Sequence, residues 1–332
     1  MIVNRVGFSP YQCGATAILF AAVLWGTTGV AASFAPNISP LGIGAFAMGV
    51  AGIIQAGLAY KKLKLQFACL VQQKNILLLS ALALAVYPLA FYSSMRLAGV
   101  AVGTVVSIGS APLFAALLEY LFNTTLSLTK RWLISVVIGL IGIALLAFGE
   151  PHMPDLSPLG QTAKQVSEHA TGYITDQAAP HRQLWGIALG LLAGLTYASY
   201  AWAARAMIDS GVHSQAAIGG IFGLGALLLL PSLFFTGDNL FSSTGNALVS
   251  VYMALIPMTL GYIAFGYGLR HINASSASLL TLMEPVVAAI LAVLIVGEVI
   301  SPLGWFGMLL IMVCLWVQAT EKRADDSIGS EQ

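Results

Sequence analysis

Long apolar segments alternate with short polar ones along almost the whole chain. A hydropathy window of about 19 residues, which is suited to membrane helices, marks ten apolar segments in the sequence. A helix of about 20 residues crosses a hydrocarbon core about 30 Å thick. The pattern therefore predicts an all-α, polytopic membrane protein with ten transmembrane helices. The predicted helices lie near residues 14–33, 41–60, 75–95, 99–121, 131–149, 184–206, 214–235, 247–269, 273–297 and 302–319.

A polar stretch divides the apolar segments into two sets of five. We expect a first repeat at residues 14–149 and an external linker at 150–183. A second repeat should follow at 184–319, and a cytoplasmic tail at 320–332.

An internal sequence match supports the two halves. Residues 91–122 and 265–296 each contain an aromatic pair, an arginine, small residues and a proline in that order, with one residue of slip. Because each set holds an odd number of helices, the second set should cross the membrane in the opposite direction. Inverted repeats of this kind are typical of secondary transporters, which place the substrate site at the repeat interface near the midplane.

Lysine and arginine fall mainly on one side of the predicted membrane. With the N-terminus inside, three of these residues lie outside and eleven inside. Cytoplasmic loops carry the excess of basic residues, so we expect both termini in the cytoplasm and a location in the bacterial inner membrane. The outer residues are Arg96, Lys164 and Arg182, and the inner ones are Arg5, Lys61, Lys62, Lys64, Lys74, Lys130, Arg131, Arg205, Arg270, Lys322 and Arg323.

Glu284 is the one ionisable residue between positions 273 and 297, and it lies near the predicted midplane. A carboxylate at this depth is costly and usually faces protein or water rather than lipid. We predict that Glu284 binds substrate and couples transport to protons. The alternative is a structural carboxylate that hydrogen-bonds to neighbouring helices.

Two prolines occupy matching places in the repeats. Pro285 follows the acid directly, and Pro112 is its counterpart in the first half. A proline inside a helix removes one backbone hydrogen bond and bends the helix. We therefore expect both prolines to act as hinges in helices that line the transport path.

Several aromatic residues reach the same depth as Glu284 when they are counted inward from the start of their own helices. Membrane-protein aromatics concentrate at the interfaces, so a group at the midplane predicts a substrate-binding pocket, with helix packing as the alternative. Rings around an acid suit a positive group through cation–π contacts, which favours an amine, an amino acid or an amphipathic compound. These residues are Trp25, Tyr87, Tyr197, Tyr200 and Tyr262.

Composition narrows the class of protein. The chain is 58% hydrophobic and 8% charged, against about 25% charged in soluble domains. Its net charge of +1 gives no reason to expect a nucleic-acid partner. Three scattered cysteines provide no metal site, and no catalytic motif or cofactor loop is found. We expect neither an enzyme nor a cofactor, but a monomer or weak homodimer in the lipid bilayer.

Two short runs carry a family resemblance. The run LWGTTG at residues 24–29 and the stretch from Met283-Glu284-Pro285 to Glu298 resemble the first and ninth helices of the drug/metabolite transporter superfamily, of the EamA-domain type. The resemblance covers residues 14 to 319. It implies two five-helix repeats and a secondary carrier that exports a small metabolite by alternating access.

The resemblance leaves one asymmetry and one alternative class. The first half has Ala111-Pro112 where the second has Glu284-Pro285, so an acid cannot act symmetrically in the two repeats. A membrane channel or a non-transporting, lipid-handling protein is the alternative function. A channel needs a continuous polar pore, whereas the polar residues here gather near the middle of the predicted helices.

Overall fold

The computed structural model describes residues 9–98, 100–122, 129–148, 180–297 and 299–320. Within these ranges, ten helical segments are long and apolar enough to cross a membrane. The predicted all-α architecture with ten spans is thereby confirmed. Most of the predicted linker at 150–183 and of the tail at 320–332 lies outside the described residues, so both stay predictions.

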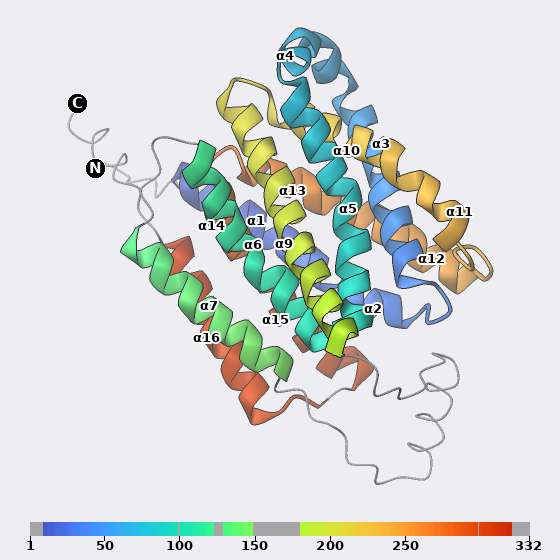
Figure 1. Ribbon diagram of the computed structural model, residues 1–332, viewed down its shortest axis with the longest axis vertical. Helices are drawn as coiled ribbons and strands as arrows, with labels where there is room; N and C mark the ends of the chain where they lie inside the picture. The colour runs from blue at the N-terminus through green and yellow to red at the C-terminus, as the bar shows by residue number, and fades with distance from the viewer. Residues whose placement is uncertain (1–8, 99, 123–128, 149–179, 298, 321–332) are drawn as a thin grey trace, which may run out of the picture.

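The first five spans are built from six helices, and a seventh, short helix connects two of these spans (Figure 1). Span one combines two helices because the chain is interrupted at Thr27. The short helix α4 (Phe67–Gln72) connects spans two and three. The spans are α1 (Pro10–Gly26) with α2 (Thr28–Ser33), α3 (Pro40–Leu65), α5 (Lys74–Ala98), α6 (Val100–Phe122) and α7 (Lys130–Phe148).

The second five spans are more interrupted than the first. Spans eight and nine each contain a π-helical segment. In such a segment the backbone hydrogen bonds join residues about five apart instead of the four of an α-helix. The spans are α9 (Pro180–Asp209), then α10 (Ser214–Leu229) with η1 (Leu230–Ser232) and α11 (Leu233–Thr236), then α12 (Thr244–Met253) with η2 (Ala254–Leu260) and α13 (Gly261–Gly268), then α14 (Ala274–Leu280) with α15 (Met283–Leu291) and η3 (Ala292–Val296), and last α16 (Pro302–Ala319).

Local sequence signals explain where several helices begin. Ser9 and Gln12 form a reciprocal capping box at the start of α1, and Ser301 caps α16 by accepting a bond from the Gly304 amide. Prolines stand in the first turn of α1, α3 and α16. A proline is suited to this position because the first amides of a helix have no partner within it.

Helices of the two halves are interleaved around a common core. Helix α3 packs against α10, and α7 against α16, which pairs the second and fifth spans of one half with those of the other (Figure 1). Helix α5 packs against α9, and α1 packs against α13. In each of these two pairs, the third span of one half packs against the first span of the other half. A two-fold relation between inverted repeats requires this equivalence. The fully buried Tyr200, Phe222 and Phe265 lie in this shared core.

Close backbone approach holds one of these pairs together. A Cβ atom on Gly219 of α10 would come within 3.0 Å of the Gln55 carbonyl oxygen on α3. Small residues allow such contacts between membrane helices, where lipid supplies no hydrophobic drive for association. The outer surface is correspondingly apolar, with Leu79, Leu227 and Phe234 exposed.

Candidate functional site

The aromatic residues predicted at the midplane form one connected cluster. Trp25 lies 4.7 Å from Tyr262 between ring centroids, and Tyr197 lies 5.2 Å from Tyr200 and 5.7 Å from Tyr87. The hydroxyl groups of Tyr200 and Tyr262 share a hydrogen bond of 2.8 Å. Residues from α1, α5, α9 and α13 therefore meet, although they are far apart in the sequence.

Four of these aromatics and the predicted acid line the same small cavity. Trp25, Tyr87, Tyr197, Tyr262 and Glu284 surround a volume of about 60 Å³. The fifth aromatic, Tyr200, packs behind Tyr197 and Tyr262 and does not line it. Small-molecule sites usually measure roughly 300–1,000 Å³, so this cavity is smaller than a typical substrate site. The substrate-binding role of all these residues stays a prediction.

Sequence reasoning missed further residues of the cavity wall. Pro88 and Tyr92 on α5 line it beside Tyr87, and Thr28 lines it beside Trp25. Helical spacing could have found Phe91, which also lines the cavity, because it lies four residues after Tyr87 and residues four apart share a helix face. Met258 could not have been found in this way, since it lies in the π-helical segment η2.

Glu284 lies at a break in the ninth span. Helix α14 ends at Leu280, the chain turns at Thr281 and Leu282, and α15 begins at Met283. The Glu284 amide donates to the Thr281 carbonyl at 2.9 Å. Glu284 is thus in the first turn of a half-helix, where the dipole is positive. Discontinuous helices with such ends form the ion and substrate sites of many transporters.

The carboxyl group of Glu284 has no bonding partner among the residues that the structure describes. Across the described residues, its side chain makes no hydrogen bond or ion pair. The described cavity wall contains no lysine or arginine. The binding and coupling roles of Glu284 stay predictions, as does the structural alternative.

The two predicted hinge prolines have different surroundings. Pro285 is the third residue of α15, where its missing amide costs little because early helical amides are unpaired. Pro112 instead lies inside α6, which continues through it. No described residue of α6 lines the cavity. The hinge roles of both prolines stay predictions, but the break at 281–282 precedes Pro285.

The eighth span is interrupted beside the cavity by the π-helical segment η2. Two backbone carbonyl groups of this segment accept hydrogen bonds from side chains of other spans. The Trp25 indole donates to the Pro257 carbonyl at 2.9 Å, and the Gln55 amide donates to the Thr259 carbonyl at 2.9 Å. Single-turn π segments are frequent at functional sites. This segment positions Trp25 in the cavity wall.

The run at residues 24–29 brings the first span against the acid. A Cβ atom on Gly26 would lie 2.7 Å from the Glu284 carbonyl oxygen and 2.6 Å from the Val287 Cβ atom. At the interruption that follows, the Thr27 hydroxyl donates to the Leu24 carbonyl at 2.6 Å and contacts the Tyr252 hydroxyl at 2.8 Å. Helix α1 can approach α15 because position 26 has no side chain.

Comparison with known proteins assigns the family. The sequence profile of the EamA-like transporter family matches residues 12–148 and 184–319, which are the two five-span halves. The chain belongs to the EamA-like transporter family. The resemblance inferred from residues 24–29 and from the Glu284-Pro285 pair is confirmed, and this EamA-like protein is a multi-pass bacterial membrane transporter with the family domain present twice.

Individual relatives agree with this assignment. The EamA-like chain is 30% identical to "Uncharacterized transporter YwfM" of Bacillus subtilis over 315 residues, which cover 92% of this chain and 93% of the relative. It is 25% identical to "Uncharacterized inner membrane transporter YicL" of Salmonella typhimurium over 302 residues, covering 89% and 91%. A crystal structure with 19% identity matches 96% of this chain and 99% of its own, with a TM-score of 0.68. That likeness shows the fold.

Proposed function

We propose that this transporter exports a small organic molecule with a positive group, such as an amine or an amino acid, and exchanges it for protons. The observation that carries the proposal is the Glu284 carboxyl group, which lines an aromatic cavity without a bonding partner among the described residues. A carboxylate balances a positive charge, and the faces of Trp25 and the tyrosines add cation–π attraction. The described wall offers no basic residue for a phosphorylated substrate.

Alternating access is supported by the small size of the cavity between the interleaved repeats. At about 60 Å³ the cavity is smaller than an amino acid requires, so binding and release need other conformations. The break at Thr281 and Leu282 gives the ninth span a place to move. Glu284 binds substrate or proton but not both, and each ligand favours a different conformation. A ligand shifts a conformational equilibrium only through such a difference in affinity.

Counterflow in liposomes tests the carrier against the channel. Purified protein is reconstituted in vesicles loaded with one unlabelled primary amine or amino acid at a time, and uptake of the labelled compound is followed. We expect transient accumulation that saturates with concentration, because a carrier exchanges one bound molecule for another. Uptake that rises linearly without counterflow would support the channel, and no uptake of any amine or amino acid would reject this substrate class.

The proposed topology places both termini inside. Reporter fusions at Lys62, Gln165 and Arg323 are expected to show cytoplasmic, external and cytoplasmic locations. The reason is the eleven-to-three distribution of basic residues together with the positive-inside rule. Alkaline phosphatase and green fluorescent protein fusions give opposite readouts at each position and so control for expression. A cytoplasmic location of Gln165 would contradict the proposed orientation of the second half.

A further inference from the structure

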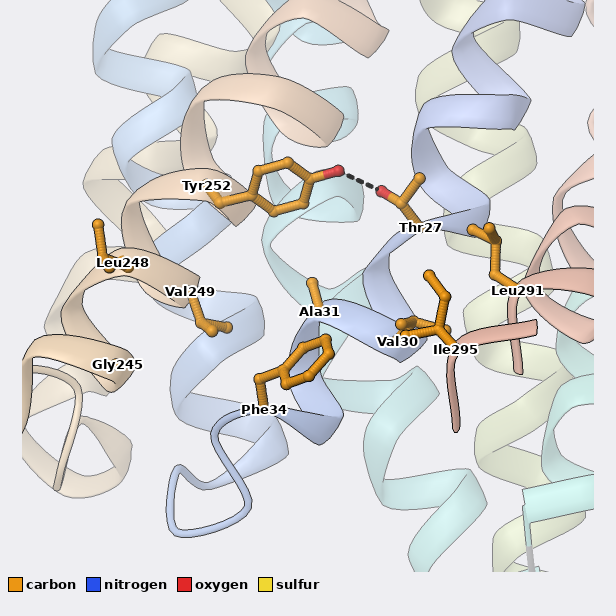
Figure 2. A pocket seen from close by; sticks show the side chains of 10 residues that line it. All are labelled: Thr27, Val30, Ala31, Phe34, Gly245, Leu248, Val249, Tyr252, Leu291 and Ile295. Carbon is orange, nitrogen blue, oxygen red and sulfur yellow. Dashed lines mark hydrogen bonds between the residues drawn. The ribbon is translucent and has the colours of Figure 1, made fainter. Parts of the chain in front are cut away.

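A second, larger cavity lies beside the candidate site. It measures about 510 Å³ and is formed by α2, α12, α15 and η3 (Figure 2). Its wall is almost entirely apolar, with Val30, Phe34, Val249 and Leu291 among the side chains drawn around it. The polar side-chain groups of this wall are the hydroxyls of Thr27 and Tyr252. We refer to it as the side cavity.

Three chain segments connect the side cavity to the cavity at Glu284. On α15, Glu284 lines one and Leu291 the other. These residues are seven apart, so they share a helix face and are separated by two turns, or roughly 10 Å. The neighbouring residues Thr27 and Thr28 are divided between the two cavities in the same way, as are Tyr252 and Met253.

A hydrogen bond lies at one end of the side cavity. The Thr27 and Tyr252 hydroxyls lie 2.8 Å apart at one end of the side cavity, while the apolar residues lie beyond them (Figure 2). Thr27 stands at the interruption between α1 and α2, and Tyr252 stands one residue before the end of α12. The next residues along the chain, Thr28 and Met253, line the cavity at Glu284, so this contact lies next to both cavities.

The far end of the side cavity opens to the surroundings of the protein. Phe34, Leu248 and Ile295 line it and are 64%, 66% and 54% exposed. Leu248 and Ile295 belong to membrane spans. Leu248 lies near the start of its span and Ile295 ends its own, so an apolar molecule can enter the side cavity from the membrane near the ends of these spans.

We propose that the side cavity binds the apolar tail of an amphipathic amine whose positive head is bound at Glu284. The inference rests on the proposed function and narrows its substrate class to amines with a long alkyl or aryl tail. The head contacts the acid and the rings, and the tail extends roughly two helical turns along α15. The Thr27–Tyr252 pair separates to let the tail pass and closes again behind short substrates.

Binding of a homologous series tests the tail site. Primary alkylamines from ethylamine to octylamine are titrated calorimetrically into purified protein in nanodiscs. In the wild type we expect affinity to rise about fourfold for each methylene that enters the side cavity, the ratio set by burial of one methylene. Ala31→Trp fills the cavity and should remove this rise while leaving the affinity for ethylamine unchanged. Leu79→Trp, at an exposed site on α5, is the matched control and should behave as the wild type.

Further arms separate the failures. Val249→Phe fills the cavity from the opposite wall and should repeat the Ala31→Trp result, which guards against one misfolded variant. An equal rise with chain length in wild type and both filled variants would overturn the tail site. If the filled variants lose affinity for alkyl alcohols to the same extent as for alkylamines, the tail site is also overturned. Apolar chains, including those of lipids, would then bind the side cavity without a head group at Glu284. Ethylamine counterflow that persists in these cases leaves the proposed function standing, whereas failure of every amine to bind rejects both.

Discussion

Replacing Glu284 with glutamine is expected to abolish transport driven by a pH gradient while slow exchange down a substrate gradient continues. Glutamine preserves the size of the side chain but cannot take up or release a proton. One pH unit corresponds to 1.36 kcal/mol, so one-for-one exchange with protons sustains about a tenfold substrate ratio. The measurement is the substrate ratio across vesicles with and without an imposed gradient of one pH unit. The ratio should fall from about ten in the wild type to one in the variant.

Glu119 provides a matched control within the same membrane domain. It is also a buried acid, at 1% exposure in α6, but one of its carboxylate oxygens accepts a bond from the Ser275 amide at 3.2 Å. Glutamine can accept the same bond, so Glu119→Gln should retain the response to the gradient. A wild type that ignores the gradient, or a Glu284→Gln variant that still follows it, would make Glu284 a structural acid.

The ten spans and the shared cavity could be predicted because both depend on position along the membrane normal. Hydropathy defines where each span begins, and counting inward places Trp25, Tyr87, Tyr197, Tyr262 and Glu284 at one depth. Depth does not define which way a side chain points around its helix. Tyr200 has the right depth, but it packs behind Tyr197 and Tyr262.

The interruptions of the spans could be predicted only in part. Sequence analysis expected Pro285 to bend the ninth span, and the chain breaks within the turn before it, at Thr281 and Leu282, where a proline at 285 leaves the Thr281 carbonyl without its usual helical partner. Sequence could not show the tertiary contact made at the break, where the Tyr197 hydroxyl donates to the Thr281 hydroxyl at 3.4 Å. The matching proline of the first half, Pro112, lies in a continuous helix. Equal position in a repeat therefore does not guarantee equal backbone geometry.

The side cavity could not be predicted from sequence at all. Its wall combines α2, α12, α15 and η3, and each contributes ordinary apolar residues. Any of these side chains would also suit a lipid-facing or a packed position. Its volume depends on how these elements pack against one another, which hydropathy along the sequence does not define.

A methyl group at position 26 is expected to disrupt the contact between the first and ninth spans. In Gly26→Ala the new Cβ atom would meet the Glu284 carbonyl oxygen at 2.7 Å and the Val287 Cβ atom at 2.6 Å. Neither neighbour is the free end of a flexible side chain, so α1 must move away from α15. Overpacking of this kind costs about 1–3 kcal/mol. The displacement also moves Trp25 relative to Glu284, so the rate of amine counterflow should fall together with the melting temperature.

Gly29 is the control for this substitution. It lies three residues further along in α2, and a Cβ atom there would meet no atom within 4 Å. Alanine is favoured over glycine in a helix by up to about 1 kcal/mol, so Gly29→Ala should leave the melting temperature unchanged or raise it slightly. Melting is followed by size-exclusion chromatography of heated, detergent-solubilised protein, and counterflow is measured on the same preparations. If the two alanine variants melt and transport alike, close approach at Gly26 is not what holds the acid against the aromatic cavity.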